Sequence, residues 1–119
     1  MVVFSNRHLG ASTELVMSAE LATAMLAAVR DAAAGAAEGR WEHELVAWLE
    51  RRAAQPTGTL DVGDVAWTPD HFEPQRVFMI DAIARAAVAA HEHAAALRRW
   101  REMIAAHPRA SVRTGRRWQ

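Results

Sequence analysis

The stretch FEPQRVFMIDAIARAAVAAHEHAAALRRWREMIAA, residues 72–106, decides the fold of this chain. After Pro74 it contains neither glycine nor proline, the two residues that most often interrupt a helix. Between positions 80 and 104, apolar residues recur at heptad spacing, and only Arg101 breaks the series. The pattern predicts one long helix over residues 70–106 or thereabouts, which Pro108 ends.

The start of this helix is predicted in the segment TPDHFE. Asp70 followed three residues later by Glu73 matches a capping box, in which each carboxylate accepts a backbone N–H. Thr68 is the alternative cap, and it would make the residues that follow it a separate turn before the main helix. Trp67 and Phe72 are expected to pack together and to fix the angle at which the chain enters the helix.

The length of the predicted helix conflicts with the length of the chain. Unbroken, the helix would be ~50 Å long at about 1.5 Å per residue. A compact chain of this size has a radius of gyration of about 13–14 Å. We therefore expect either a bend near the HEH segment at 91–93 or a far half that rests on another molecule.

The rest of the sequence predicts shorter elements. Ser12 is the expected N-cap of a first helix that ends near Gly35, and a second helix is expected over residues 40–54. Short strands are predicted at residues 2–4 and 112–114, and residues 59–67 are predicted to form a short strand or an extended loop. Gly63 is expected to form a bulge. The predicted fold is a mainly α, small α+β domain with three helices, the third much the longest, and two or three short strands.

Composition favours one small domain. The chain has 119 residues, enough for one core, and its 27 alanines favour helices. It has no cysteine, which excludes disulfides and thiolate chemistry. No apolar run reaches the ~20 residues that span a bilayer. We expect a single domain over residues 1–119, a cytoplasmic location without membrane contact, and a loosely held basic tail at 108–119.

Charge is unevenly distributed, although the formal net charge is zero. Residues 1–95 have seven arginines and thirteen acidic residues, and residues 96–119 have seven arginines and one glutamate. Every basic residue is arginine, which suits pairing with carboxylates or phosphates, although a GC-rich coding bias gives the same composition. The predicted binding residues, for a protein partner or an anionic ligand, are Arg98, Arg99, Trp100, Arg101, Arg113, Arg116, Arg117 and Trp118.

Signals for catalysis or metal binding are weak. No two of the six histidines have the i,i+3 or i,i+4 spacing that places two ligands on one helix face. Asp61 and Asp64 form either a carboxylate pair or, more simply, a turn. We predict no catalytic residue, no cofactor and no metal ligand, and an enzyme or metal site around His71 ranks third among the functional hypotheses.

The leading hypothesis is a non-enzymatic module that binds another protein. Its most concrete form is an inhibitor-like or toxin-neutralising, immunity-type bacterial protein, which fits the small size, the missing catalytic motifs and the charge split. The alternative is a protein that associates with nucleic acid through its arginine-rich end, with weak and non-specific affinity. The same end could instead pair with the acidic remainder of the chain.

The alanine-rich stripe of residues 80–104 also predicts a homodimer. Alanine allows two helices to approach closely but buries little area. A first helix of 22 residues covers only about 33 Å of the long helix. The end with Trp100 and Ile104 would then need cover from a second copy.

Overall fold

The computed structural model describes residues 1–7 and 14–107. This part has four α-helices, α1 (Ala19–Ala36), α2 (Arg40–Ala54), α3 (Phe72–Ala89) and α4 (Ala94–Ala105). It has three strands, β1 (Val2–Ser5), β2 (Glu14–Met17) and β3 (Gly58–Asp61). The prediction of a mainly helical α+β fold is confirmed, but the number of helices is four and not three.

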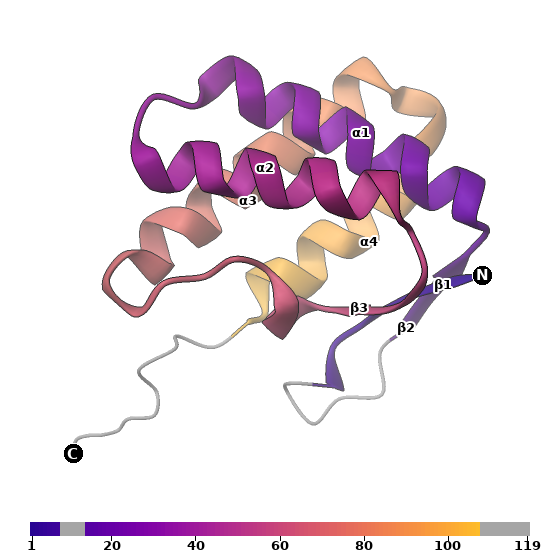
Figure 1. Cartoon of the computed structure of the whole chain (residues 1–119). Helices are drawn as coiled ribbons and strands as arrows, with labels where there is room; N and C mark the ends of the chain where they lie inside the picture. Colours follow the sequence, from indigo (N-terminus) through magenta and orange to yellow (C-terminus); the bar gives the residue numbers. More distant parts are fainter. Residues whose placement is uncertain (8–13, 108–119) are drawn as a thin grey trace.

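The three strands form one small sheet at the lower side of Figure 1, in the order β2-β1-β3. β1 pairs antiparallel with β2 and parallel with β3, so that Val2 lies opposite both Met17 and Gly58. The central strand is buried, with Phe4 fully inaccessible. β1 confirms the strand predicted at residues 2–4.

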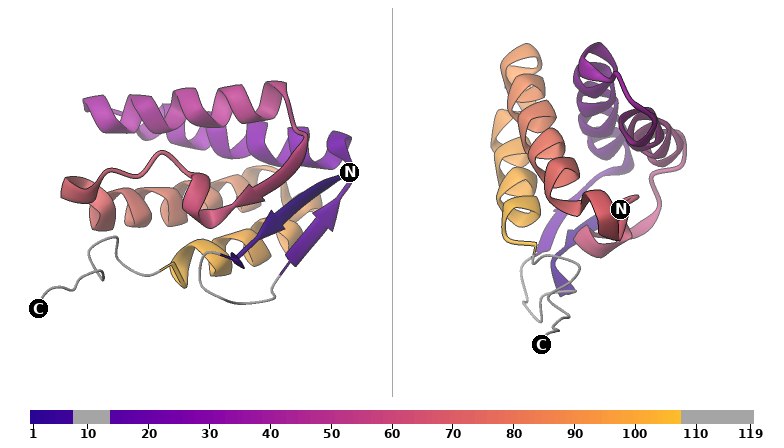
Figure 2. Two further views of the ribbon diagram at one scale, coloured as in Figure 1. Left: turned by 60° about the horizontal axis from the view of Figure 1, so that its bottom comes forward. Right: turned by 90° about the vertical axis from the view of Figure 1, so that its left-hand side faces the viewer.

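The helices form two pairs that lie side by side, as both views of Figure 2 show. α1 packs along α2, α3 packs along α4, and α1 contacts α3 where the two pairs meet. The core fills the space between the helix pairs and the sheet. No helix in the described residues is both long and apolar enough to cross a bilayer.

The first helix begins later than predicted. Residues 14–17 form β2, and α1 starts at Ala19 with Ser18 as its N-cap. The Ser18 hydroxyl oxygen accepts the backbone N–H of Leu21 at 3.1 Å. Ser12, the predicted cap, lies outside the described residues. Leu15 fits the apolar pattern of a helix as well as that of a strand. In the structure it lies opposite Phe4, so pairing with β1 makes this segment a strand.

The predicted helix over 70–106 is two helices. α3 ends at Ala89, residues His91–His93 form a 3₁₀ turn (η4), and α4 begins at Ala94. At Ala90 the backbone leaves the helical region, with φ −118° and ψ 61°. The bend expected near 91–93 is confirmed, and the radius of gyration of 13.8 Å agrees with the compact alternative.

The capping box predicted at the start of α3 is wrong. Pro69–His71 form a 3₁₀ turn (η3), and Thr68 is at its N-cap position, as in the alternative prediction. The side chain of Gln75 supplies the cap: its Oε1 accepts the Thr68 backbone N–H at 2.9 Å. Its Nε2 donates to the Thr68 hydroxyl at 3.2 Å.

Two other local predictions have different outcomes. Trp67 and Phe72 do pack edge to face, with ring centroids 5.1 Å apart, as expected. In the segment 59–67, predicted as a strand or an extended loop, the strand ends at Asp61 and Val62–Asp64 form a 3₁₀ turn (η2). Gly63 is therefore not a bulge: it lies in this turn, which the Asp61 carboxylate caps by accepting the Gly63 N–H at Oδ2, at 2.9 Å. The strand predicted at 112–114 lies outside the described residues.

Candidate functional site

The arginine-rich end was the site predicted from the sequence, and the structure describes its first half. On α4, Arg98 and Arg99 are exposed and Arg101 is half-buried. None of the three forms an ion pair within residues 1–7 and 14–107. The other half of the predicted site lies outside the described residues: Arg113, Arg116, Arg117 and Trp118.

Trp100 is not a surface residue. Its side chain is fully buried and packs edge to face on Phe4, with ring centroids 5.3 Å apart and an interplanar angle of 73°. The face of α4 that it shares with Leu97 and Ile104 is the one that faces the core. The prediction that Trp100 stacks on a ligand is therefore wrong, since a ligand cannot reach the ring.

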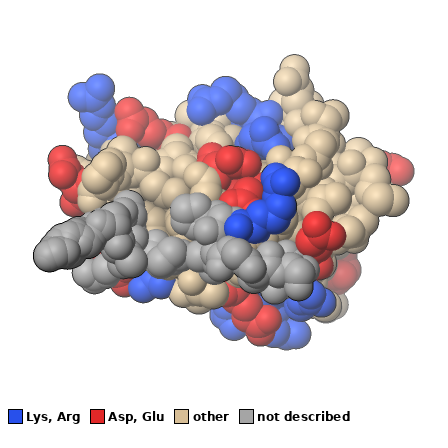
Figure 3. All heavy atoms as spheres, turned by 90° about the horizontal axis from the view of Figure 1, so that it is seen from below, with Lys and Arg blue, Asp and Glu red and all other residues tan. Residues whose placement is uncertain are grey.

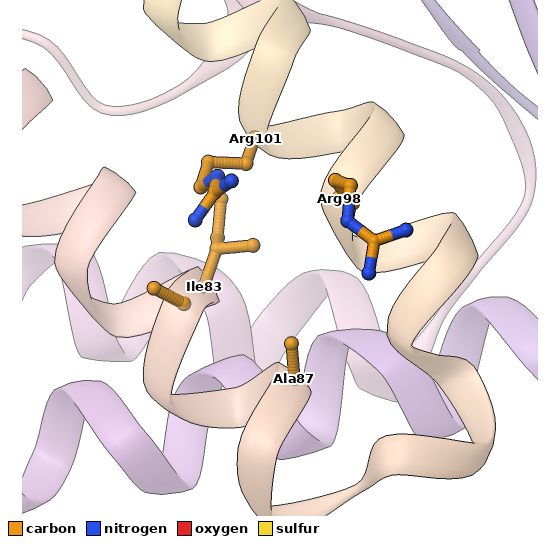
Figure 4. Close-up of a pocket in the computed structure, with 5 residues that line it drawn as sticks. Ile83, Ala87, Arg98 and Arg101 are labelled. Carbon is orange, nitrogen blue, oxygen red and sulfur yellow. The ribbon is translucent and has the colours of Figure 1, made fainter.

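A small hollow lies between α3 and α4 beside the arginines (Figure 4). Arg98 and Arg101 of α4 flank it, and Ile83 and Ala87 of α3 lie on its other side. Ala84 completes the lining, and the volume is about 120 Å³. The structure thus brings two of the predicted binding residues to one cavity.

The charge split along the sequence does not become a single charged face on the side of the molecule that Figure 3 shows. Acidic and basic groups alternate over the part of that surface that the structure describes. Several are joined in pairs, such as Arg85 with Asp81 at 3.0 Å and Arg76 with Glu73 at 2.8 Å. Binding sites must therefore be sought in local groups of residues.

A wide, open groove lies between the start of α2 and the first half of α3, with a volume of about 660 Å³. Its apolar residues are Trp41, Pro74, Val77 and Phe78, and its acidic residues are Glu42, Glu73 and Asp81. We call it the Trp41 groove. The sequence analysis did not find it.

The aromatic residues hold the Trp41 groove in shape. Phe78 packs edge to face on Trp41, with ring centroids 5.7 Å apart and an interplanar angle of 88°. The ring of His71 lies beside that of Trp41, with ring centroids 6.3 Å apart and an interplanar angle of 31°. Both Trp41 and Phe78 are half-buried against the core. Val77 is 57% exposed, so its side chain is accessible to a partner.

The acidic residues of the Trp41 groove are held in place. One carboxylate oxygen of Glu42 accepts the backbone N–H groups of Gly39 at 2.5 Å and Glu38 at 2.6 Å. These hydrogen bonds, with Gly39 the largest cause, hold the pKa of Glu42 below its usual value, so the carboxylate is ionised at neutral pH. No basic residue lines the groove. It therefore offers apolar surface with negative charge beside it.

The carboxylates of Asp61 and Asp64 accept hydrogen bonds from nearby backbone N–H groups and from the Ser5 hydroxyl. Asp61 accepts the Ser5 hydroxyl at 2.6 Å as well as the Gly63 N–H, and Asp64 accepts the Asp61 N–H at 3.1 Å. These bonds join β1 to the turn after β3. The structure therefore favours the turn over the carboxylate pair for acid–base chemistry.

His71 contacts Trp41 and Thr68, and neither contact points to catalysis or metal binding. Besides Trp41, its Nδ1 lies 3.5 Å from the Thr68 hydroxyl, and the side chain is exposed. Among residues 1–7 and 14–107, no three histidine, aspartate or glutamate side chains lie close enough to hold a metal ion. A site around His71 gains no support from the geometry.

No protein-family model, curated protein or solved structure matches this chain.

Proposed function

We propose that this protein is a non-enzymatic module that binds another protein through the Trp41 groove. The observation that carries the proposal is the groove itself, in which Trp41, Phe78 and the exposed Val77 lie together. A few residues, enriched in tryptophan, tyrosine and arginine, supply most of the binding energy in protein interfaces. An exposed apolar surface of this kind on a small protein is typical of an interface.

The chemistry of the Trp41 groove defines the partner. An apolar floor along a helix accepts the apolar face of an amphipathic helix, whose anchors recur every three to four residues. Glu42 favours lysine or arginine at the edge of that face, whereas Glu73 and Asp81 are already paired with Arg76 and Arg85. We therefore propose a partner that presents a basic amphipathic helix. An inhibitor-like or toxin-neutralising role, in which the module covers a basic surface of its target, is the concrete form.

Nucleic-acid association stays a prediction for a different part of the molecule. Exposed Arg98 and Arg99 can attract phosphates, but burial of Trp100 removes one of the two aromatic residues predicted to stack on a base, and the other, Trp118, lies outside the described residues. What remains is charge attraction, and such binding falls steeply with salt because each neutralised phosphate releases counterions. This keeps the nucleic-acid hypothesis in second place.

Two valines of α3 give a matched test of the Trp41 groove. Val77 lines the groove, whereas Val88 lies outside its lining on the same helix and is 80% exposed. A photo-reactive amino acid at position 77, and in a second sample at position 88, would cross-link partners in extract of the native host. A protein captured from 77 and not from 88 is then purified, and its Kd is measured by calorimetry.

We expect Val77→Glu to weaken binding of that partner by about tenfold or more, because it places a charge on the apolar floor. Val88→Glu should leave the Kd within about twofold. Equal losses in the two variants, or a partner whose contact segment is acidic, would contradict the proposal. Capture of a second copy of this chain at position 77 would instead make the groove a self-association surface.

A further inference from the structure

The hollow between α3 and α4 has the composition of an anion site, independent of the Trp41 groove. Two arginines line it and no acidic residue does. Arg98 and Arg101 are three positions apart on α4, so their side chains leave the same face of the helix. Figure 4 shows them on either side of the space above Ile83 and Ala87.

The hollow exists because α3 is alanine-rich where α4 faces it. Ala84 and Ala87 carry only a methyl group each, and larger side chains at these positions would fill the space. The floor is apolar and offers no acceptor for the guanidinium groups. An anion in the hollow would therefore displace only water from them. Hydrogen bonds between charged groups are strongest where water is partly excluded.

The donors of these two arginines are unused within the part of the chain that the structure describes. Some other arginines there are paired, such as Arg30 with Asp31 at 3.1 Å and Arg85 with Asp81 at 3.0 Å, whereas Arg7, Arg51, Arg52 and Arg99 form no ion pair among the described residues. Arg98 and Arg101 have no such partner in residues 1–7 and 14–107. Each guanidinium carries five N–H donors in a planar fork that matches an oxyanion.

We infer that this hollow binds a phosphate monoester group. The hollow has a volume of about 120 Å³ and opens to solvent, so it can take a phosphate group while the rest of the ligand stays outside it. A terminal phosphate is close to a dianion at neutral pH, which matches two guanidinium charges, whereas a phosphodiester carries one. The ligand is a small molecule or chain end with a terminal phosphate.

Calorimetry or NMR titration of the whole protein with methyl phosphate tests the inference. Arg98→Gln and Arg101→Gln should each weaken binding by about tenfold, since each removes a charge-assisted contact. Arg99→Gln is the matched control, because it removes the same charge from the same helix outside the hollow. It should change the affinity by no more than about twofold.

A second variant separates the cavity from the charge. Ala87→Leu fills the hollow and keeps every arginine, and it should abolish methyl phosphate binding while thermal unfolding shows a folded protein. Binding to the unmodified protein should strengthen from pH 5 to pH 7.5, because the second pKa of the phosphate is about 6.

Three results would overturn the inference. Equal losses with Arg98→Gln and Arg99→Gln would show general charge attraction. Unchanged affinity in a folded Ala87→Leu protein would show that the cavity has no role. Tighter binding of an oligonucleotide without terminal phosphates than of methyl phosphate would assign these arginines to a nucleic-acid surface instead.

Discussion

Gln75 shows at the residue scale how one side chain determines the entry into α3. It is almost fully buried, and its amide group both accepts the Thr68 N–H and donates to the Thr68 hydroxyl. The two residues are seven positions apart, so the pairing does not match the three-residue spacing of a capping box. Sequence reasoning therefore assigned the cap to Asp70, which lies exposed in the 3₁₀ turn.

We predict that Gln75→Ala lowers the free energy of unfolding by about 1–3 kcal/mol, because it leaves a partly buried backbone donor without its acceptor. Asp70→Ala is the comparison and should change stability by no more than about 0.5 kcal/mol. Urea denaturation followed by tryptophan fluorescence measures both. A larger loss of unfolding free energy for Asp70→Ala than for Gln75→Ala would support the capping box predicted at Asp70 and Glu73.

At the scale of elements, the sequence predicted helices well where the information is local. α2 has the bounds expected from its apolar face, Arg40 to Ala54, and β1 lies where VVF predicts it. The sequence missed β2, and it left the α3–α4 break as one of two alternatives. Both depend on packing between distant segments: β2 on its pairing with β1, and the break on α4 folding back along α3.

The break between α3 and α4 contains no proline or glycine that would have predicted it from the sequence. Alanines surround Ala90, and each favours helix, so local propensity opposes a turn there. The cost of leaving the helix is small beside the burial of Leu97, Trp100 and Ile104 that folding back makes possible. Only the mismatch between helix length and compact size indicated the bend in advance.

The N-terminus of α2 gives an element-scale prediction with a pH dependence. Glu42 caps this helix through the N–H groups of Gly39 and Glu38, which lowers its pKa in the folded state from 4.5. A depressed folded pKa adds stability that is complete above the unfolded value and is lost as pH falls through the folded one. We expect Glu42→Gln to lower the urea midpoint at pH 7, and the difference from the natural sequence to shrink below pH 4.5.

Glu44→Gln is the control for this effect. Glu44 lies on the same helix and, unlike Glu42, pairs with a side chain: it contacts Arg40 at 3.6 Å in an exposed i,i+4 pair. Exposed pairs of this kind add little to stability. A pH profile for Glu42→Gln that runs parallel to that of the natural sequence between pH 2 and 7 would show that the carboxylate charge does not stabilise the cap.

For the whole molecule, the candidate sites differ in how far the sequence could show them. Arg98 and Arg101 were found because charged residues on an alanine-rich helix are expected to be exposed. Trp100 was placed with them because the sequence does not say which face of α4 meets Phe4. The Trp41 groove needs α2 and α3 side by side, and the one sequence signal for it was that α3 is apolar on nearly every side.

The same packing bears on self-association. The homodimer predicted through residues 80–104 depended on an uncovered end, but Leu97, Trp100 and Ile104 are buried within the chain's own core. The exposed apolar residues of α3 are Val77 and Val88 instead. A symmetric dimer through the Trp41 groove would place the same patch on both sides of the interface. It would therefore bring two copies of the acidic Glu42 into one interface, whereas Glu73 and Asp81 are already paired with Arg76 and Arg85.

We therefore expect light scattering to give the mass of one chain, 13.1 kDa, over a wide concentration range. The double change Leu97→Glu and Ile104→Glu should unfold the protein and not merely alter its mass, because it buries two charges in the core. Circular dichroism of the variant shows whether it is unfolded or is a folded protein with a different mass. A folded double variant of one-chain mass, beside a natural protein of two-chain mass, would establish the dimer through residues 80–104. That result would also require α4 to turn its apolar face towards a second copy.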